Sequence, residues 1–369
     1  MRFESGSVRA AACAAGLLLG AAGLPAEAAP VEPPPNTYDT VHLGEGVDAF
    51  ISTKSGFANG NTVLVVGDDA ALVVDSGISP SIARQIIADI RRKTDKPVRY
   101  LVNTHWHEDH WLADVEYRKA FPGIVIVSTE FTRERIEKEI PGAIQKMIAN
   151  AQAESKNFEE ALARGTRKDG TPLDDAARKK YQDVIDDMAF SQADFRQAGV
   201  LVSPDLTFEQ GIRLYLGKRE VRVSWLGLGN TGGDAVTYVP DAKVVAAGDL
   251  VVLPTPFSLG SYPKEWIETL RKLSALDTVS LVPGHGPVQR DPTYVNTLMR
   301  LLESVVTQVA EAVRSGATLE ETRTRVHLDD LEKELTKGDA RLDPMFQAYF
   351  VVPAVERAYQ EAKGAYGPE

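Results

Sequence analysis

The chain has 369 residues, 43% hydrophobic and 25% charged, so it can bury a sizeable core, although its length alone does not separate one domain from two. Its formal net charge is -11, and its lysines and arginines form no block. This composition argues against nucleic acid as a partner, because nucleic-acid binding needs a basic surface.

The N-terminus has the pattern of an export signal. Two arginines flank a short polar start, an apolar run follows over 10–24, and Ala26-Glu27-Ala28 supplies the small residues of a cleavage site. Because the run is too short for a membrane span, we predict a signal peptide over 1–28 and a periplasmic or secreted protein whose mature chain begins at Ala29. Cys13, the single cysteine, lies inside this signal, so the mature chain has no disulfide.

The next segment predicts a Pro-rich, flexible leader over 29–40, followed by a folded domain from Val41. Apolar runs separated by turns containing glycine and aspartate predict strands at 47–52, 61–66 and 71–74. Ser79-Pro80 then marks the start of a helix that ends near Arg92. Further strands and a helix alternate to about residue 127, which is typical of an α/β fold.

The densest group of metal-ligand side chains is Asn103-Thr104-His105-Trp106-His107-Glu108-Asp109-His110, directly after the apolar run 100–102. On an extended backbone His105 and His107 project from one face, whereas Asp109 and His110 are adjacent and point in different directions. Imidazole and carboxylate together suit zinc and do not exclude iron or manganese. One strand end could therefore serve one or two metal ions.

Residues from about 132 to 199 change character to long, charged, helix-favouring sequence, which predicts an inserted helical hairpin. Apolar stripes at helical spacing define its inner faces: Ile144, Met147, Ile148 and Ala151, then Tyr181, Val184, Ile185 and Met188. The insertion is expected to cover the body, or to act as a lid, or to join copies in a homo-oligomer.

The remaining chain predicts more strands and then a helical extension. The strands are expected at 205–208, 212–216, 220–226, 235–239, 243–247 and 279–282, with a helix at 264–276. The extension covers 291–369, where Thr318 and Glu321 form a capping-box pattern.

Three more strand-end turns carry polar residues that suit a site. They are Gly229-Asn230-Thr231-Gly232-Gly233-Asp234, Gly248-Asp249-Leu250 and Val282-Pro283-Gly284-His285-Gly286. Strand-end loops are where α/β folds collect functional groups. Phe257, Tyr262 and Trp266 follow the second turn and are candidates for substrate-facing aromatics, whereas His42 and His327 are expected to be surface or packing residues.

In their order and spacing these segments resemble the metallo-β-lactamase-fold metallo-hydrolase superfamily over about 41–290. The resemblance implies an αββα sandwich with the site at one edge, between two sheets. It also implies that His105 and His107 bind one metal, that Asp109, His110 and His285 bind a second, and that Asp249 bridges them. Asn230 stands where the family usually has histidine, so it is a weak ligand or a substrate-orienting residue, and the first metal site is the less complete one.

The resemblance implies an exported metal-dependent hydrolase with a small-molecule substrate, in which metal-bound hydroxide attacks the carbonyl of an ester, lactone, thioester or lactam. Asp109 is expected to orient that nucleophile and to accept its proton. Two alternatives stay open: a β-lactamase proper, and a non-hydrolytic periplasmic metal-binding accessory protein of a redox system.

Overall fold

The structure is a computed structural model that describes residues 31–53, 59–339 and 342–365. The predicted signal peptide, residues 1–28, lies outside the described residues. Within the described ranges no helix is both long enough and apolar enough to cross a membrane.

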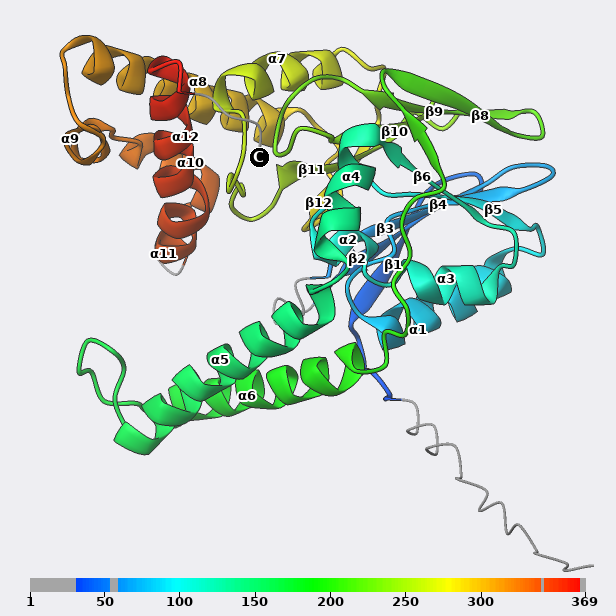
Figure 1. Cartoon of the computed structure of the whole chain (residues 1–369), viewed down its shortest axis with the longest axis horizontal. Coiled ribbons are helices and arrows are strands. Elements are labelled where there is room, and N and C mark those ends of the chain that lie inside the picture. Colours follow the sequence, from blue (N-terminus) through cyan, green and yellow to red (C-terminus); the bar gives the residue numbers. More distant parts are fainter. Residues whose placement is uncertain (1–30, 54–58, 340–341, 366–369) are drawn as a thin grey trace, which may run out of the picture. The chain divides into compact units, whose positions relative to one another are not determined.

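Two β-sheets form the centre of the fold (Figure 1). The first sheet keeps the order of the sequence, with strands β1 (Tyr38–Gly44), β2 (Val47–Ser52), β3 (Thr62–Val66), β4 (Ala71–Val74), β5 (Val98–Val102), β6 (Val125–Thr129) and β7 (Leu206–Phe208). The second sheet has the order β12-β11-β10-β9-β8, with strands β8 (Gly211–Leu216), β9 (Arg219–Trp225), β10 (Ala235–Val239), β11 (Val244–Val252) and β12 (Ser280–His285).

Both faces of the first sheet are buried, because its side chains alternate between two cores. In β4, Leu72 and Val74 pack against the second sheet, whereas Ala71 and Val73 pack under helices. Those helices are α1 (Pro80–Lys93) and α3 (Asp114–Ala120). The predicted start of α1 is confirmed, because the Ser79 side chain accepts a hydrogen bond from the Ile82 amide and Pro80 occupies the first turn.

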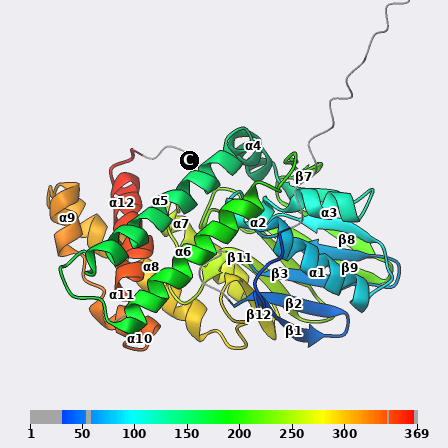
Figure 2. The same cartoon turned by 90° about the horizontal axis from the view of Figure 1, so that it is seen from below.

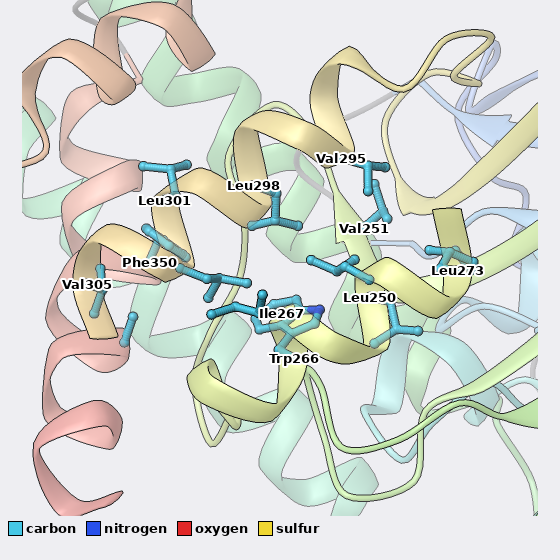
Figure 3. Close-up of a cluster of buried hydrophobic side chains, with 14 of the residues drawn as sticks. Leu250, Val251, Trp266, Ile267, Leu273, Val295, Leu298, Leu301, Val305 and Phe350 are labelled. Carbon is cyan, nitrogen blue, oxygen red and sulfur yellow. The ribbon is translucent and has the colours of Figure 1, made fainter. Parts of the chain in front are cut away.

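The second sheet repeats this alternation on its own outer face. In β11, Val244 and Ala246 join the core between the sheets, whereas Val245 and Ala247 face helices. These helices are α7 (Pro263–Ser274), α8 (Thr293–Arg314) and α12 (Val352–Ala362). Figure 3 shows Leu250 and Val251 of β11 among the buried side chains of α7 and α8. The helix-sheet-sheet-helix sandwich that the sequence predicted is confirmed.

The inserted segment forms helices that begin directly after β6. They are α4 (Glu130–Glu139), α5 (Ala143–Arg164) and α6 (Asp175–Phe195). Helices α5 and α6 run side by side in both views (Figures 1 and 2), and their facing side chains include the ring pair Phe158–Tyr181. The hairpin is fixed to the body where Asp194 accepts hydrogen bonds from the Ser79 hydroxyl and the Ser81 amide at the start of α1.

The C-terminal extension is helical, as predicted, with α8 followed by α9 (Leu319–Arg325), α10 (Asp329–Thr336), α11 (Asp343–Phe346), a π-helical turn at Gln347–Val351 and α12. The predicted capping box of Thr318 and Glu321 is present at the start of α9. At the other end of the domain the leader prediction was too long, because β1 begins at Tyr38, which pairs with Ser52 of β2.

Candidate metal centre

The candidate ligands come from the carboxyl ends of two parallel strand pairs, one in each sheet. Strand β5 runs parallel to β4 and is followed by the histidine motif, whose last residues begin the short helix α2 (Glu108–Trp111). Strand β11 runs parallel to β12, and these two strands carry Asp249 and His285. Carboxyl ends of parallel strands lie at one edge of a sheet, so residues far apart in sequence meet there.

Asp249 lies at the middle of the cluster. Its Oδ2 is 3.5 Å from Nε2 of His105 and 3.9 Å from Nδ1 of His107, and its Oδ1 is 3.3 Å from Nε2 of His110. The same Oδ1 is 3.6 Å from Nε2 of His285. One carboxylate is therefore shared among the histidines of both sheets, which suits a bridging ligand.

Among the described residues, two groups of three could each hold an ion. One consists of His105, His110 and Asp249, and the other of Asp109, His110 and His285. In the second group Asp109 Oδ2 is 2.8 Å from Nε2 of His285 and 3.5 Å from Nε2 of His110. The second group is the set that the resemblance implied for the second metal. The first contains His110 in place of His107. Because Nε2 of His105 and Nδ1 of His107 are 2.8 Å apart and both lie within 3.9 Å of Asp249 Oδ2, the implied pairing of His105 with His107 remains a prediction.

Buried polar atoms without hydrogen-bond partners indicate that the cluster suits a cation. His110 Nε2, Asp249 Oδ1 and Asn230 Oδ1 are all buried and lack a hydrogen bond among the described residues. Such atoms are rare in folded proteins and need an explanation. A divalent cation accepts electron pairs from imidazole nitrogen and carboxylate oxygen, so it would satisfy the atoms of His110 and Asp249 at once.

Asp75, which the sequence analysis did not include among the site residues, fixes the orientation of His110. Its Oδ2 is 2.8 Å from Nδ1 of His110, and it accepts hydrogen bonds from the backbone amide and the hydroxyl of Thr104. A carboxylate cannot donate, so Nδ1 carries a hydrogen, and Nε2 is the nitrogen that faces the cluster and would present its lone pair to a cation. The signal that could have identified Asp75 is its place directly after β4, at the same edge as the motif.

The electrostatics of the cluster agree with this arrangement. Burial, with a smaller contribution from neighbouring His110, lowers the pKa of His105 to about 4, so its ring is neutral at pH 7. Burial alone would raise the pKa values of Asp109 and Asp249, but the adjacent histidines outweigh it and lower both. Burial alone would lower the pKa of His110, but Asp109, Asp249 and Asp75 raise it well above its usual value. The carboxylates that stabilise this proton would equally attract a cation.

Hydrogen bonds between the two sheets hold the edge together. The Asn61 side chain, at the start of β3, donates to the carbonyls of Pro283 and Gly286, 2.9 Å away in each case. The Ala235 amide of β10 donates to the carbonyl of Thr104 at 2.7 Å. Gly284 is required here, because a Cβ at that position would lie 1.9 Å from Oδ1 of Asp249.

Asn230 is fully buried beside this edge. Its side-chain nitrogen donates to the carbonyl of Phe257 at 2.6 Å, and the ring of Phe257 lies 5.5 Å from that of His107, measured between centroids. The hydrogen bond to Phe257 fixes the amide, and its oxygen is the unpaired atom noted above. The two roles predicted for Asn230, weak ligand and orienting residue, both remain predictions.

A cavity of about 570 Å³ opens beside the cluster. Its polar lining includes His107, Glu108, Asp109, Asp249 and His285. Its apolar lining includes Ile78, Met147, Leu253, Phe257, Met345 and Tyr349. Phe257 therefore faces the cavity as one of the predicted aromatics, whereas Tyr262 and Trp266 are buried and do not line it. No lysine or arginine among the described residues lines it.

The other histidines lie away from the cluster. His42 is 3.1 Å from Asp48, with 69% of its side chain exposed, and His327 is exposed. The sequence analysis missed Met147, Met345 and Tyr349 as residues beside the site. Met147 was noted only as part of an apolar stripe, and no motif marks the other two.

Known proteins resemble this chain in sequence and in fold. A linear primary-alkylsulfatase of Pseudomonas sp. (strain ATCC 19151) is 23% identical over 278 residues, which cover 72% of this chain and 49% of that protein. The chain thus spans about half the length of this curated relative. The solved structure of the stereoselective inverting sec-alkylsulfatase Pisa1 from Pseudomonas sp. matches with a TM-score of 0.61 and 15% identity, covering 89% of this chain and 51% of that one.

Smaller enzymes of the same fold match over less of the chain. A metallo-beta-lactamase from Pontibacter korlensis matches with a TM-score of 0.47 and 18% identity, covering 72% of this chain and 99% of that one. The family model described as the metallo-beta-lactamase superfamily matches residues 55–285, more than half of the chain and the span that holds all of the candidate ligands. The chain therefore belongs to the metallo-beta-lactamase superfamily.

Proposed function

We propose that the protein is a metal-dependent hydrolase that cleaves the ester-type bond of a small molecule. The observation that carries the proposal is the cluster of histidines and aspartates at one side of a largely apolar cavity of about 570 Å³. Asp109, His110 and His285 would hold one divalent ion, and His105, His107 and Asp249 would hold another, because the single lone pair of His110 Nε2 can serve only one ion. When bound, such an ion lowers the pKa of water and polarises the oxygen of the scissile bond.

The chain's own residues would position water and substrate. Asp109 lines the cavity with 19% of its side chain exposed, and its pKa is lowered, so it is ionised at neutral pH. An ionised carboxylate there can accept a hydrogen bond from the attacking water and take up its proton. Phe257 and the apolar wall would exclude other water from the reacting group.

Among carbonyl compounds an ester, lactone, thioester or lactam would suit this chemistry. A second candidate bond is the sulfate ester of an alkyl chain, which the alkylsulfatase relative and the apolar lining both favour. A β-lactam is the third candidate, because members of this fold act as metallo-beta-lactamases.

A substrate panel tests this proposal. Zinc-loaded protein would be assayed on p-nitrophenyl butyrate, a γ-lactone, a thioester, an alkyl sulfate and nitrocefin, with metal content measured in the same samples. We expect turnover of at least one ester, and a loss of about 10² to 10⁴ in kcat for Asp109→Asn, the scale of general acid–base catalysis. Full zinc content without turnover of any substrate would instead support the accessory metal-binding protein.

Export is part of the proposal and rests on the residue pattern of 1–28. A signal peptide cut after Ala28 leaves Ala29 as the first residue. The intact mass of the protein recovered from the periplasm or the medium should match this mature chain. A mass that includes Met1 would contradict export by cleavage.

A further inference from the structure

One wall of the cavity comes from helices outside the two sheets. Met147 is in α5 of the insertion, Met345 is in α11, and Tyr349 is in the π-helical turn that follows α11. The latter two lie beyond residue 285, where the match to the superfamily model ends. This wall therefore comes from the helical insertion and the C-terminal helices rather than from the two sheets.

Polar contacts hold this wall against the histidine motif and against the loop that contains Phe257 and Ser258. Lys146, next to Met147, forms an ion pair with Glu108 of the histidine motif, with 2.6 Å between Nζ and Oε1. Ser258 donates from its backbone amide to the Tyr349 carbonyl and from its hydroxyl to the Phe350 carbonyl. These carbonyls belong to the π-helical turn, a geometry that is common at functional sites.

A row of aromatic rings connects the ligand cluster with this wall. The ring centroid of Phe257 lies 5.5 Å from that of His107 and 5.8 Å from that of Tyr349. Two more exposed apolar residues are near Tyr349. Val352 follows it by three residues in a helical segment, and Leu259 follows Ser258, whose amide donates to the Tyr349 carbonyl. Met345, Tyr349, Val352 and Leu259 are 40%, 42%, 45% and 47% exposed, and they are among the most exposed large hydrophobic side chains of the described residues. Met345 and Tyr349 line the cavity, and exposed apolar residues at a cavity are typical of a binding surface.

We propose that the substrate is an amphiphile with a single unbranched apolar chain, which lies against Met147, Met345 and Tyr349 and leaves the cavity over Val352 and Leu259. The proposal rests on the proposed function, because it assumes that the hydrolysable head lies at the ligand cluster. Methionine side chains are unbranched and flexible, so two of them in one wall adapt to a linear chain better than to a rigid ring system. Met345 and Tyr349 are then residues that determine chain-length specificity.

A binding experiment tests the proposal without requiring turnover. The dissociation constants of butyl, hexyl and octyl sulfonate, which have no ester bond to hydrolyse, would be measured by calorimetry on the zinc-loaded protein, below their critical micelle concentrations. In the wild type we expect the constant to fall about two- to fourfold for each added methylene, the scale of burying a methylene group. In the double variant Met345→Ala/Tyr349→Ala the change per methylene should fall by half or more, while butyl sulfonate binding changes less than twofold.

Two further variants keep the test decisive. Met147→Ala, on a different helix, should also reduce the dependence on chain length. Tyr215→Ala removes a tyrosine of β8 that is 57% exposed and does not line the cavity, and it should leave that dependence unchanged. Equal dependence in all four proteins, or none in the wild type, would overturn the proposal. The proposal would also be overturned if the double variant kept the chain-length dependence of the wild type and changed only the oligomeric state in sedimentation. The exposed apolar residues around Tyr349 would then join copies of the chain.

Hydrolysis of an ester series separates this inference from the proposed function. Turnover of p-nitrophenyl esters from acetate to octanoate with the same kcat/KM would overturn the inference and leave the proposed function standing. If sulfonate binding tightens with chain length but the protein hydrolyses no substrate, the proposed function would be overturned and the apolar-chain site would stand. When both hold, the wall variants should raise KM for the octanoate, whereas Tyr215→Ala should leave KM and kcat for both the octanoate and the acetate within twofold.

Discussion

At His110 the two ring nitrogens have different partners, and the difference determines whether the residue can bind a metal. Nδ1 is held by Asp75, and Nε2 points to Asp109 and Asp249. His110 belongs to both candidate ion groups, so its orientation affects the whole centre. Asp75 and Thr104 therefore matter to the site although neither belongs to either group.

Asp75→Asn should weaken metal binding without removing a ligand. An asparagine that keeps its oxygen toward the Thr104 amide presents its NH₂ group to Nδ1 of His110, which must then give up its hydrogen. The hydrogen moves to Nε2, and the lone pair that faces the cluster is lost. We expect a fall of about 10- to 100-fold in zinc affinity, measured by competition with a chelator. Unchanged affinity would mean that His110 does not bind through Nε2.

Asn230→His tests whether this position faces the first ion. An imidazole supplied there should raise the affinity of that ion by about 1 to 3 kcal/mol, roughly tenfold to a hundredfold. Metal stoichiometry should then approach two, as measured by titration of the wild type and the variant. Activity need not rise, because the variant loses the hydrogen bond that holds the Phe257 carbonyl. Equal metal stoichiometry and affinity in the wild type and the variant would mean that Asn230 does not face the ion, and that its role is the hydrogen bond to Phe257.

Asp114 gives a prediction about pH. Burial raises the pKa of its carboxyl to about 8, despite hydrogen bonds from Ser76 and Asn103 that lower it. Since the folded pKa lies above the unfolded value of about 3.9, the group stabilises the fold fully at low pH, and this contribution is lost as pH rises toward the folded pKa. Asp114→Asn keeps the acceptor for Asn103 and cannot ionise. The free energy of unfolding of the wild type should therefore fall relative to that of Asp114→Asn between pH 5 and 8, by up to about 1.4 kcal/mol per pH unit. A constant difference across this range would contradict the assignment.

At the scale of elements, polar contacts at both ends of the hairpin join the insertion to the body. Asp194, fully buried near the end of α6, accepts hydrogen bonds at the start of α1, and Lys146 near the start of α5 reaches Glu108 of the histidine motif. The base of the hairpin packs in one apolar cluster with Ile78 and with Trp111 of α2. The insertion thus adjoins the site, whichever of the expected roles it has.

Asp194→Ala should destabilise the protein, because it leaves the Ser81 amide and the Ser79 hydroxyl without their partner. The cost of such buried unpaired groups is about 1 to 3 kcal/mol in the free energy of unfolding, measured by urea denaturation. Asp183→Ala, on the same helix, is the matched control. Its side chain is 58% exposed and pairs only with Lys179, so its effect should stay within about 0.5 kcal/mol. Equal effects of the two substitutions would show that Asp194 does not anchor the hairpin.

At the scale of the whole molecule, most of the sandwich could be predicted from the sequence because local patterns carry it. Runs such as 71–74 are short, apolar and bounded by turns, and Ser79-Pro80 determines where α1 begins. The start of β1 could not be predicted, because Tyr38 follows a Pro-rich segment and is held by contacts with distant residues. It pairs with Ser52, and its hydroxyl donates to Asp89.

The candidate site, too, could be predicted from the sequence only in part. The histidine motif could be predicted as a metal site from the spacing of its residues. The contact of His110 with both Asp109 and Asp249 could not, because it depends on how the two sheets pack together. Met345 and Tyr349 come to the cavity through the packing of the C-terminal helices, for which their local sequence gives no signal.

The central claim is that one cluster of side chains binds the metal on which hydrolysis depends. The most direct test measures metal content and ester turnover together in wild type, His110→Ala, His285→Ala and His327→Ala. We predict that the first two variants lose bound metal and activity in parallel, because each removes a ligand from the group of Asp109, His110 and His285, whereas exposed His327 can be replaced without either loss. Full metal occupancy in His110→Ala and His285→Ala would contradict the account.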